Sequence, residues 1–400
     1  MQTKTKIIGF EKFKTILILA LLSAIAPLSI DMYLPALTQV QNSFNSSSFL
    51  TQLSLASFFI GFAIGQLIYG PLSDVFGRKK PIYVGIILFI ASSIGCVLID
   101  SAYAFIILRF TEALGGCVGV VIARAIVNDL FDIKEAASIF ALMMIVSSLA
   151  PMLSPTFGSL LLYLFSWHSI FLFLFIFGII IILFVIFGLK ESLNKDKRIK
   201  FSKDNIIKAY KEVLNDKVFL IYIFIGALVM AGMFAYITGS SFVFMNFFKL
   251  SESQYGVLFG INALGFMIFA NMNARLTFKY SPIIILNKAF KIITFTSIIL
   301  ILISFFDFNF FIFEILLFLN ISIFGFLMPN ITTLAMARFD KNSGTASSIL
   351  GTTQFALAGF VAFIVSVLEA NEPFFISIII TICILLGSFI YFVFAKKNIN

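Results

Sequence analysis

The fold is decided by the stretch Gly70-Pro71-Leu72-Ser73-Asp74-Val75-Phe76-Gly77-Arg78-Lys79-Lys80, which joins two apolar runs at residues 49–71 and 80–99. A bilayer core is roughly 30 Å thick and a helix rises roughly 1.5 Å per residue, so a run of roughly 20 apolar residues can cross it. The stretch ends in three consecutive basic residues, which concentrate in loops on the cytoplasmic side of membranes. It therefore predicts a short cytoplasmic turn between two membrane-spanning helices.

Four residues of this stretch are predicted to form a conformational-switch loop. Gly70 would let two helices approach closely, and Gly77 would permit a tight turn at positive φ. Asp74 can cap a helix N-terminus or pair with a base, and Arg78 would hold the loop on the cytoplasmic side.

The composition extends the prediction to the whole chain. Of 400 residues 60% are hydrophobic and 12% are charged, and the mean hydropathy is +1.08. A soluble domain needs a far more polar surface, so we predict an all-α membrane protein with 12 transmembrane helices and no separate soluble domain. The predicted helices span residues 15–38, 49–71, 80–99, 102–124, 136–160, 167–189, 218–245, 253–275, 283–305, 310–334, 343–368 and 373–395.

These runs divide into two sets of six. We predict an N-terminal six-helix bundle at residues 1–189, a cytoplasmic basic linker at 190–217 and a C-terminal six-helix bundle at 218–400. A faint echo between residues 135–140 and 344–350 supports two related halves, because many transporters are built from internal repeats. The linker is either an amphipathic helix on anionic lipid or a solvated hinge between the bundles.

The positive charge of the chain indicates its orientation. All but two of its 28 Lys and Arg residues fall in the terminal segments, the linker and every second loop, and the exceptions are Arg109 and Lys249. This bias predicts a multi-pass protein of the bacterial inner membrane with both termini in the cytoplasm. It also removes the support that a net charge of +9 would give to nucleic-acid binding.

Signs of enzyme chemistry are absent from the sequence. It contains no paired His/Asp metal cluster, nucleophile elbow or phosphate-binding glycine loop. The three cysteines lie in apolar runs without metal-ligand spacing. We therefore expect no catalytic residue, no metal and no cofactor.

Four ionisable residues fall inside the predicted helices, where charge is costly: Asp31, Arg109, Glu112 and Glu314. Asp31 and Arg109 both lie roughly 10 Å below the outer surface at roughly 1.5 Å per residue, so they can pair or communicate through a cavity. Burial raises a carboxyl pKa and a nearby arginine lowers it, so a conformational change that alters either contact would load or release a proton. The alternative is a static pair that only orients helices.

The two glutamates leave two interpretations open. Glu112 lies three residues beyond Arg109 on nearly the same helix face, so it either neutralises the arginine or serves as a second protonation site. Glu314 lies about one turn inside its helix, where it either extends outward to water or takes part in coupling.

The chain resembles a known family along nearly its whole length. The stretch 70–80 looks like the cytoplasmic loop signature of the major facilitator superfamily, and the rest is similar to its Bcr/CflA drug-resistance subfamily. The matching segments are Ser29–Leu37, Arg124–Phe131, Ala150–Gly158, Tyr236–Val243, Phe259–Gly265, Gly344–Ser348 and Gln354.

The resemblance implies a major facilitator fold, with two six-helix bundles around a central cavity, and alternating-access export of varied toxic compounds against protons. Residues 109–116 resemble the helix 4 motif of the superfamily, whose arginine is implicated in proton transfer. The chain departs from the subfamily at Glu112, where a glutamine is usual. Pro151, Pro155 and Gly158 resemble the two-proline antiporter motif and would form either a hinge or a tight packing site.

A proton-coupled antiporter that exports drug-like or toxic small molecules is therefore the predicted function, with Asp31, Arg109 and Glu112 in proton coupling. The substrate-cavity candidates are Tyr33, Tyr236 and Phe242, because they lie in matched segments near the outer half of the membrane. The expected partners are a small-molecule substrate, protons and membrane lipid, and we expect a monomer. The alternatives are a proton-coupled transporter of a metabolite such as an amino acid or siderophore and, more remotely, an integral-membrane enzyme.

Overall fold

The computed structural model describes residues 10–131, 139, 150, 153–193, 196, 198, 203–306, 309–339, 343–369 and 372–395. Within these ranges the chain is helical and contains no strand. Eleven of the described helical spans are long and apolar enough to cross a membrane, which confirms the predicted all-α membrane fold. The remaining predicted span, 136–160, lies largely outside the described residues and contributes the shorter apolar helix Leu153–Leu164.

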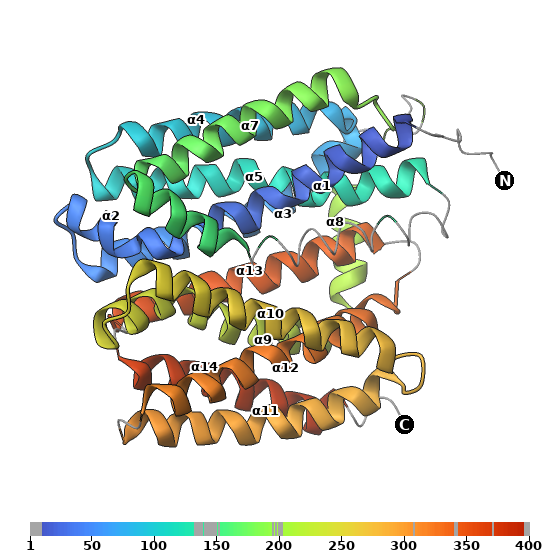
Figure 1. The fold of residues 1–400 in the computed structure, drawn as a ribbon. Coiled ribbons are helices and arrows are strands. Elements are labelled where there is room, and N and C mark those ends of the chain that lie inside the picture. The colour runs from blue at the N-terminus through green and yellow to red at the C-terminus, as the bar shows by residue number, and fades with distance from the viewer. Residues whose placement is uncertain are drawn as a thin grey trace.

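Two groups of helices make up the molecule (Figure 1). The N-terminal half contains α1 (Phe10–Asp31), η1 (Leu34–Ala36), α2 (Leu37–Ser43), α3 (Ser48–Phe76), α4 (Lys79–Leu98), α5 (Ala102–Leu130), the helix Leu153–Leu164 and α7 (His168–Gly188). The C-terminal half contains α9 (Lys217–Phe242), η3 (Val243–Phe247), α10 (Glu252–Leu276), α11 (Pro282–Phe305), α12 (Phe310–Met336), α13 (Ser343–Val367), α14 (Pro373–Ile390) and η4 (Tyr391–Ala395).

Each half packs mainly against itself. In the N-terminal half α5 contacts α1, α3 and α4, and α7 contacts α1 and α4. In the C-terminal half α9 contacts α12, α13 and α14, while α10 and α11 pack on α12. Contact between the halves runs chiefly along α3 and α13, so this pair forms one long seam.

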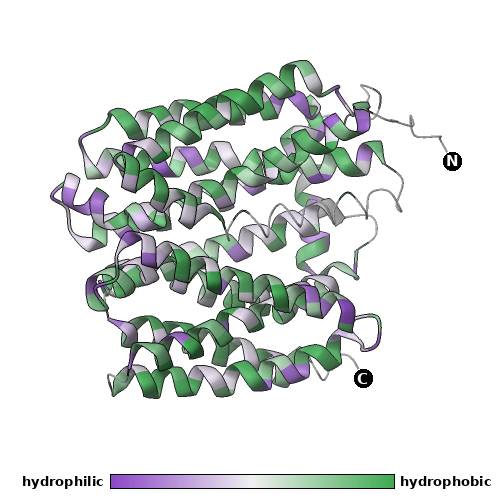
Figure 2. Cartoon of the chain, viewed as in Figure 1, coloured by the Kyte–Doolittle hydropathy of each residue, from purple (hydrophilic) through white to green (hydrophobic). Residues whose placement is uncertain are grey.

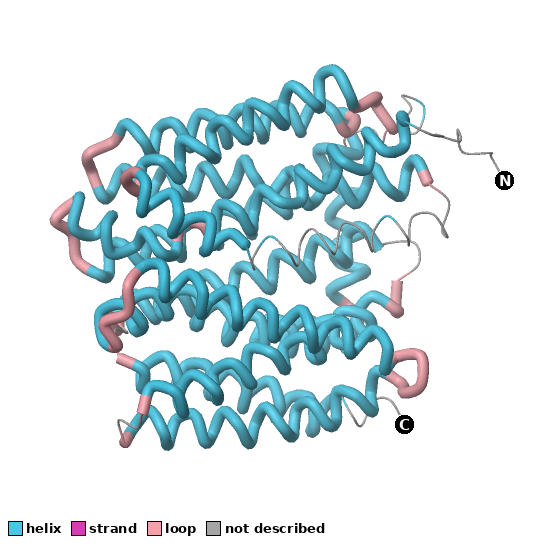
Figure 3. Tube along the Cα trace, in the orientation of Figure 1, coloured by secondary structure: helices cyan, strands magenta, loops and turns pink. Residues whose placement is uncertain are grey.

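The two ends of the helices differ in charge. The start of α1, the end of η4 and α8 (Lys203–Leu214) lie at one end of the molecule in Figure 1. We call this the basic end, and it also carries residues 77–79, 189–193, 277–281 and 337–339. The opposite, far end carries residues 44–47, 99–101, 165–167 and 248–251. Apolar helices run between two sets of short polar connections, as Figures 2 and 3 show.

The predicted linker contains a helix. α8 contacts α9 and α13, and α9 is capped by Asp216, whose side chain accepts a hydrogen bond from the Phe219 N–H at 2.8 Å. Such capping satisfies a backbone donor that the helix itself leaves free.

The first predicted helix is interrupted, and the break positions a charged residue. α1 ends at Asp31 instead of continuing to residue 38, and the 3₁₀ turn η1 follows, with Pro35 in its first turn. Proline lacks a backbone donor and disfavours helical geometry in the preceding residue, so an unbroken α-helix through this point is costly. The break leaves Asp31 at a helix end in the middle of the membrane-spanning segment Phe10–Ser43.

Candidate functional site

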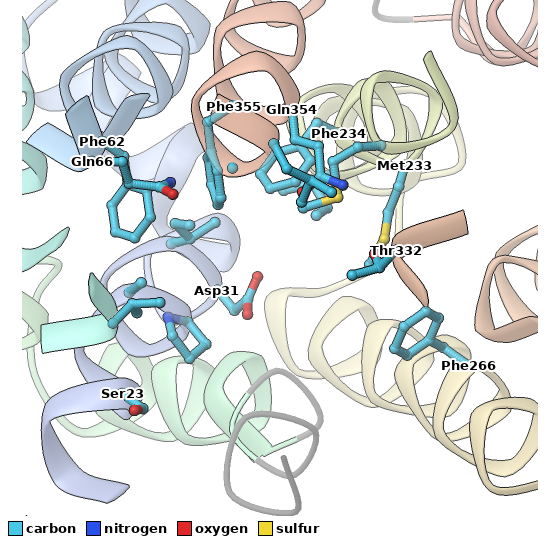
Figure 4. Close-up of a pocket in the computed structure, with 18 of the residues that line it drawn as sticks. Ser23, Asp31, Phe62, Gln66, Met233, Phe234, Phe266, Thr332, Gln354 and Phe355 are labelled. Carbon is cyan, nitrogen blue, oxygen red and sulfur yellow. The ribbon is translucent and has the colours of Figure 1, made fainter. Parts of the chain in front are cut away.

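A cavity of about 400 Å³ lies between the two halves. Both halves line it: α1, α3 and α5 on one side, and α9, α10, α12 and α13 on the other. Its walls are largely apolar, with Met and Phe side chains that can adapt to differently shaped ligands. Several of these side chains surround one space in Figure 4, namely Phe62, Phe234, Phe266, Phe355 and Met233.

Asp31 is the acidic residue of this cavity. It is 4% exposed and lines the wall, and Figure 4 shows its carboxylate pointing into the open space. Within the described part of the chain, no side chain forms a hydrogen bond or ion pair with it. Arg124 also lines the cavity, toward the basic end of α5. A carboxylate held this way has no fixed counter-ion, so a proton or a cationic ligand can neutralise it.

Arg109 and Glu112 form a separate, closed site inside the N-terminal half. Both side chains are 0% exposed, and Nη1 of Arg109 pairs with Oε2 of Glu112. Glu112 Oε1 accepts a second hydrogen bond from Ser93 Oγ at 3.0 Å. The guanidinium therefore has a carboxylate of its own, and a buried pair of this kind is neutral as a unit.

Aromatic rings complete the enclosure of this pair. The guanidinium carbon of Arg109 lies 4.5 Å from the ring centre of Phe58, 4.8 Å from that of Tyr33 and 5.4 Å from that of Phe171. Positive charge is attracted to the faces of aromatic rings, so these contacts favour the charged arginine.

Asp31 and Arg109 do not form the direct pair that their equal depth allowed. Arg109 binds Glu112 instead, and its Nη2 donates to the backbone carbonyl of Ser29 at 2.9 Å. Ser29 precedes Asp31 by two residues on α1, so the arginine contacts the same helix end through the backbone. The link between the two predicted residues is mechanical and passes through α1.

The loop after α3 contains the predicted cluster of charges. Arg78 Nε donates to Asp129 Oδ2 at 2.8 Å, and Nη1 donates to Asp74 Oδ1 at 2.6 Å and to Ser73 Oγ at 2.7 Å. Burial opposes the charged form of Arg78, but the hydrogen bonds and charges of Asp129 and Asp74 outweigh it and raise the pKa of the arginine. This loop is thereby fixed to the end of α5.

Sequence reasoning missed a further partner of this loop. Glu191, just after α7, accepts from the N–H of Arg78 at 2.9 Å and from that of Lys79 at 3.3 Å. Its carboxylate lies at the N-terminus of α4, where the helix leaves backbone donors free. Because Glu191 lies 113 residues from Arg78, no local pattern could have indicated this cap.

The two glycines of the loop behave differently. Gly77 has φ +87°, as predicted for a turn that favours glycine. The prediction for Gly70 was wrong: a Cβ added there would meet no atom within 4 Å, so no helix approaches it closely in this conformation. Close approach occurs elsewhere, and a Cβ on Gly61 of α3 would collide with the backbone of Phe110 on α5.

The described part of the predicted hinge is a packing site. Pro151 lies outside the described residues, and Pro155 is buried in the helix Leu153–Leu164. A Cβ on Gly158 would collide with the backbone of Met32, just after α1. Tight packing is therefore the interpretation that fits this conformation.

The same helix joins the two halves at the far end. Ser159 Oγ donates to the backbone carbonyl of Glu252 at 2.9 Å, and Thr156 Oγ1 donates to that of Gly256 at 3.4 Å. Gln39 Nε2 donates to the Glu252 side chain at 2.8 Å. The far-end contacts thus join the two halves on one side of the cavity, whose walls extend toward the basic end at residues 124, 332, 336 and 347.

Only one of the three predicted cavity residues lines the cavity. Tyr236 does, whereas Tyr33 and Phe242 are fully buried elsewhere and are absent from its walls, which corrects the prediction. Tyr33 packs on Arg109 instead. Sequence reasoning did not identify Gln66 and Gln354 as polar residues of the cavity wall. The sequences of α3 and α13 do not distinguish the helix face that lines the cavity from the other faces.

The family model described as Major Facilitator Superfamily matches residues 19–363 of the chain. An uncharacterized MFS-type transporter, YdgK of Bacillus subtilis (strain 168), is 31% identical over 399 residues, covering 98% of each chain. A bicyclomycin resistance protein homolog of Haemophilus influenzae is 28% identical over 393 residues, covering 97% of this chain and 98% of the relative.

Solved structures support the fold. The crystal structure of a D-xylose-proton symporter superposes with a TM-score of 0.78, covering 96% of this chain and 98% of the symporter chain. Its sequence identity is 15%, so the likeness concerns the arrangement of helices and not the substrate.

Proposed function

The chain belongs to the Major Facilitator Superfamily, and from that premise we propose that it is a proton-coupled antiporter that exports drug-like or toxic small molecules from the cytoplasm. Membership makes it a multi-pass membrane transporter and not an enzyme. The direction of transport, its coupling to protons and the class of substrate are our proposal, as is a monomeric state.

One observation carries the proposal: Asp31 lines a largely apolar cavity between the halves and has no hydrogen bond or ion pair with any described side chain. An ionised carboxylate there is costly, so it favours either a proton or a positively charged ligand. The two cannot occupy it together. Binding of substrate would release the proton, and binding of the proton would release the substrate, which is the exchange that an antiporter needs.

The orientation follows from the charges. Basic loops stay on the cytoplasmic side of the inner membrane, so we place the basic end and both termini in the cytoplasm. The cavity extends toward that end while the far-end contacts join the two halves on the other side. The conformation would then load substrate from the cytoplasm.

Arg109, Glu112 and the loop charges would support the exchange without binding substrate. Arg109 contacts the carbonyl of Ser29, two residues before Asp31, so a movement of α1 would change that contact. The cluster of Arg78, Asp74 and Asp129 would stabilise this conformation at the basic end.

Apolar and aromatic walls fit amphiphilic compounds, and the bicyclomycin resistance relative agrees with an exported toxic compound. A metabolite transporter is the second candidate, and Arg124 is the observation in its favour. An arginine and an aspartate in one cavity could hold a zwitterion such as an amino acid.

Efflux of ethidium from whole cells tests the proposal, comparing wild type with Asp31→Asn, with and without a protonophore. We expect export by wild type that stops with the protonophore, and export by Asp31→Asn no faster than from cells without the protein. Asp100→Asn is the matched control, because Asp100 is exposed between α4 and α5 and lies outside the cavity. Export that continues both in the presence of the protonophore and in Asp31→Asn would refute proton exchange at Asp31. If ethidium does not move but a labelled amino acid does, the second candidate replaces the first.

A further inference from the structure

A further acid in the membrane lies in the C-terminal half, away from the cavity wall. Glu314, near the far end of α12, accepts a hydrogen bond through Oε1 from Nδ2 of Asn262 on α10 at 2.9 Å. Asn262 is 0% exposed, so the glutamate turns inward toward the protein. The interpretation in which Glu314 extends outward to water does not fit this contact.

Asn262 also connects the glutamate to the cavity. Its Nδ2 donates a second hydrogen bond to the Tyr236 hydroxyl at 3.1 Å. The Tyr236 ring stacks on Phe259 at 5.3 Å, and both residues line the cavity that contains Asp31. Three hydrogen-bonding side chains on α12, α10 and α9 thus reach from Glu314 to the cavity wall.

Two atoms of this arrangement lack partners. Among the described residues, Oε2 of Glu314 and Oδ1 of Asn262 are buried without a hydrogen bond. Both are acceptors while the glutamate is ionised, so they cannot bond each other. A carboxylic acid and a primary amide, however, can form two hydrogen bonds at once: amide N–H to the acid carbonyl, and acid O–H to the amide oxygen. The first is present, and a proton on Oε2 would supply the second.

Glu314 has no ion pair among the described residues. No described Lys or Arg pairs with it. The titratable group linked to it is Tyr236 on α9, through Asn262, and Tyr236 in turn lies near Tyr255 on α10 and Asp31. An ionised carboxylate in such a place is costly, so a proton is the remaining way to neutralise it.

Other charges on the neighbouring helices lie too far along them. On α11 the lysines Lys288 and Lys291 fall in the half nearer the basic end, and α13 contains no charged residue. On α10 the far-end charge is Glu252, whose carboxylate is bonded to Gln39, and Arg275 lies in the last turn at the basic end.

We propose that Glu314 is a second proton-binding site of this transporter, in which Asn262 holds the neutral acid through two hydrogen bonds and links it through Tyr236 to the cavity. A role for Glu314 in coupling rests on the proposed antiport. The binding of a proton by Glu314 does not depend on that proposal.

Infrared spectroscopy of the purified protein in detergent tests this site directly, through the C=O stretching band of protonated carboxyl groups. Exposed Asp and Glu, with pKa values of about 4, are ionised at about pH 7. On an Asp31→Asn background, which removes the other candidate, we expect such a band at this pH. The band should be lost in Glu314→Gln and kept in Glu372→Gln, the same change at an exposed far-end residue.

Two further measurements make the proposal refutable if the glutamine variant folds poorly. Asn262→Leu removes the amide, so the band should shift in frequency. In the wild-type protein, dicyclohexylcarbodiimide, which modifies protonated carboxyl groups in membranes, should label Glu314, and peptide mass spectrometry should show this labelling decline as the pH rises. Equal spectra with and without Glu314, or labelling confined to Asp31, would overturn the proposal. These readouts are independent of ethidium export, so a failed efflux test leaves them interpretable.

Discussion

Glu112 and Glu314 are both glutamates in membrane-spanning helices, one in each half, yet their surroundings differ. Glu112 has a cation, Arg109, and a hydroxyl donor, Ser93. Glu314 has an amide, Asn262, and one buried oxygen without a partner among the described residues. A buried acid must be neutralised by a cation or by a proton, and only the second arrangement leaves the acid free to exchange protons. From this comparison we propose a structural role for the charge of Glu112 and a functional one for Glu314.

Asp31 belongs with Glu314 in this comparison. It has no described counter-ion, and it faces a cavity that can hold a ligand. We therefore assign proton exchange to the two unpaired acids and a supporting role to the Arg109–Glu112 pair. The assignment makes predictions that each compare a variant with a matched protein. The expected losses of stability differ in size according to how much buried charge each substitution leaves without a partner.

The largest effect is expected from breaking the buried pair. Arg109→Gln leaves Glu112 without its cation in a fully enclosed site, which should lower the free energy of unfolding by about 3–5 kcal/mol. The double variant Arg109→Gln/Glu112→Gln removes both charges and should recover much of that loss. Thermal unfolding of the purified protein in detergent measures both. If the double variant is less stable than Arg109→Gln, Glu112 is not held by the arginine and the comparison fails.

A smaller effect is expected from the hydroxyl that supports the pair. Ser93→Ala removes the hydrogen bond to Oε1 of Glu112, and a hydrogen bond to a charged group contributes about 1.5–3 kcal/mol. Ser92→Ala is the control, because Ser92 bonds the neutral Thr111 at 2.8 Å and its loss should cost about 0.5–1.5 kcal/mol. Thermal unfolding of the two variants should rank Ser93→Ala as the less stable. Equal losses would indicate that Glu112 is not ionised.

The smallest effect is expected from the half-exposed ion pair at the basic end. Arg338 Nε lies 2.8 Å from Asp216 Oδ2, and a pair of this kind contributes about 0.2–1 kcal/mol. Partial burial opposes ionisation of Asp216, but the Phe219 N–H and Arg338 outweigh it and lower the pKa of the aspartate. The stabilisation by this pair is therefore fully present above about pH 3.9, the pKa of an aspartate in the unfolded chain. It is lost as the pH falls through the pKa of Asp216 in the folded protein.

Asp216→Asn tests this sign. Its stability difference from wild type should be present at about pH 7 and disappear as the pH falls through the lowered pKa of Asp216 in the folded protein. Melting temperatures of the two proteins across this range provide the measurement, at low ionic strength because salt screens exposed pairs. A difference that grows in acid would contradict the direction of the pKa shift.

The sequence predicted the fold well because its signals are long or repeated. Apolar runs of membrane length recur along the chain, basic residues mark alternate loops, and Gly77 requires an unusual φ. These features depend on neighbouring residues and on the bilayer, so no tertiary structure is needed to interpret them. The stop at Asp31 could have been inferred from Pro35, yet the apolar run concealed it.

The site was less predictable, for a physical reason. Helices that are apolar on every side do not show which face meets lipid and which meets the cavity. Tyr33 and Tyr236 were therefore equal candidates, although one packs on Arg109 and the other lines the cavity. The partner of Glu314 lies 52 residues away, so only the fold distinguishes an inward contact from an outward one.

The most direct test of the central claim is proton release when ethidium binds to the purified protein in weakly buffered detergent solution. The account predicts that wild type releases protons on binding, that Asp31→Asn releases fewer, and that Asp100→Asn, the same change at an exposed residue, releases as many as wild type. Binding is followed in the same sample by ethidium fluorescence, so each release is counted per bound dye. Equal release by wild type and Asp31→Asn at equal occupancy would contradict the account, because the exchanged proton would then not be on Asp31.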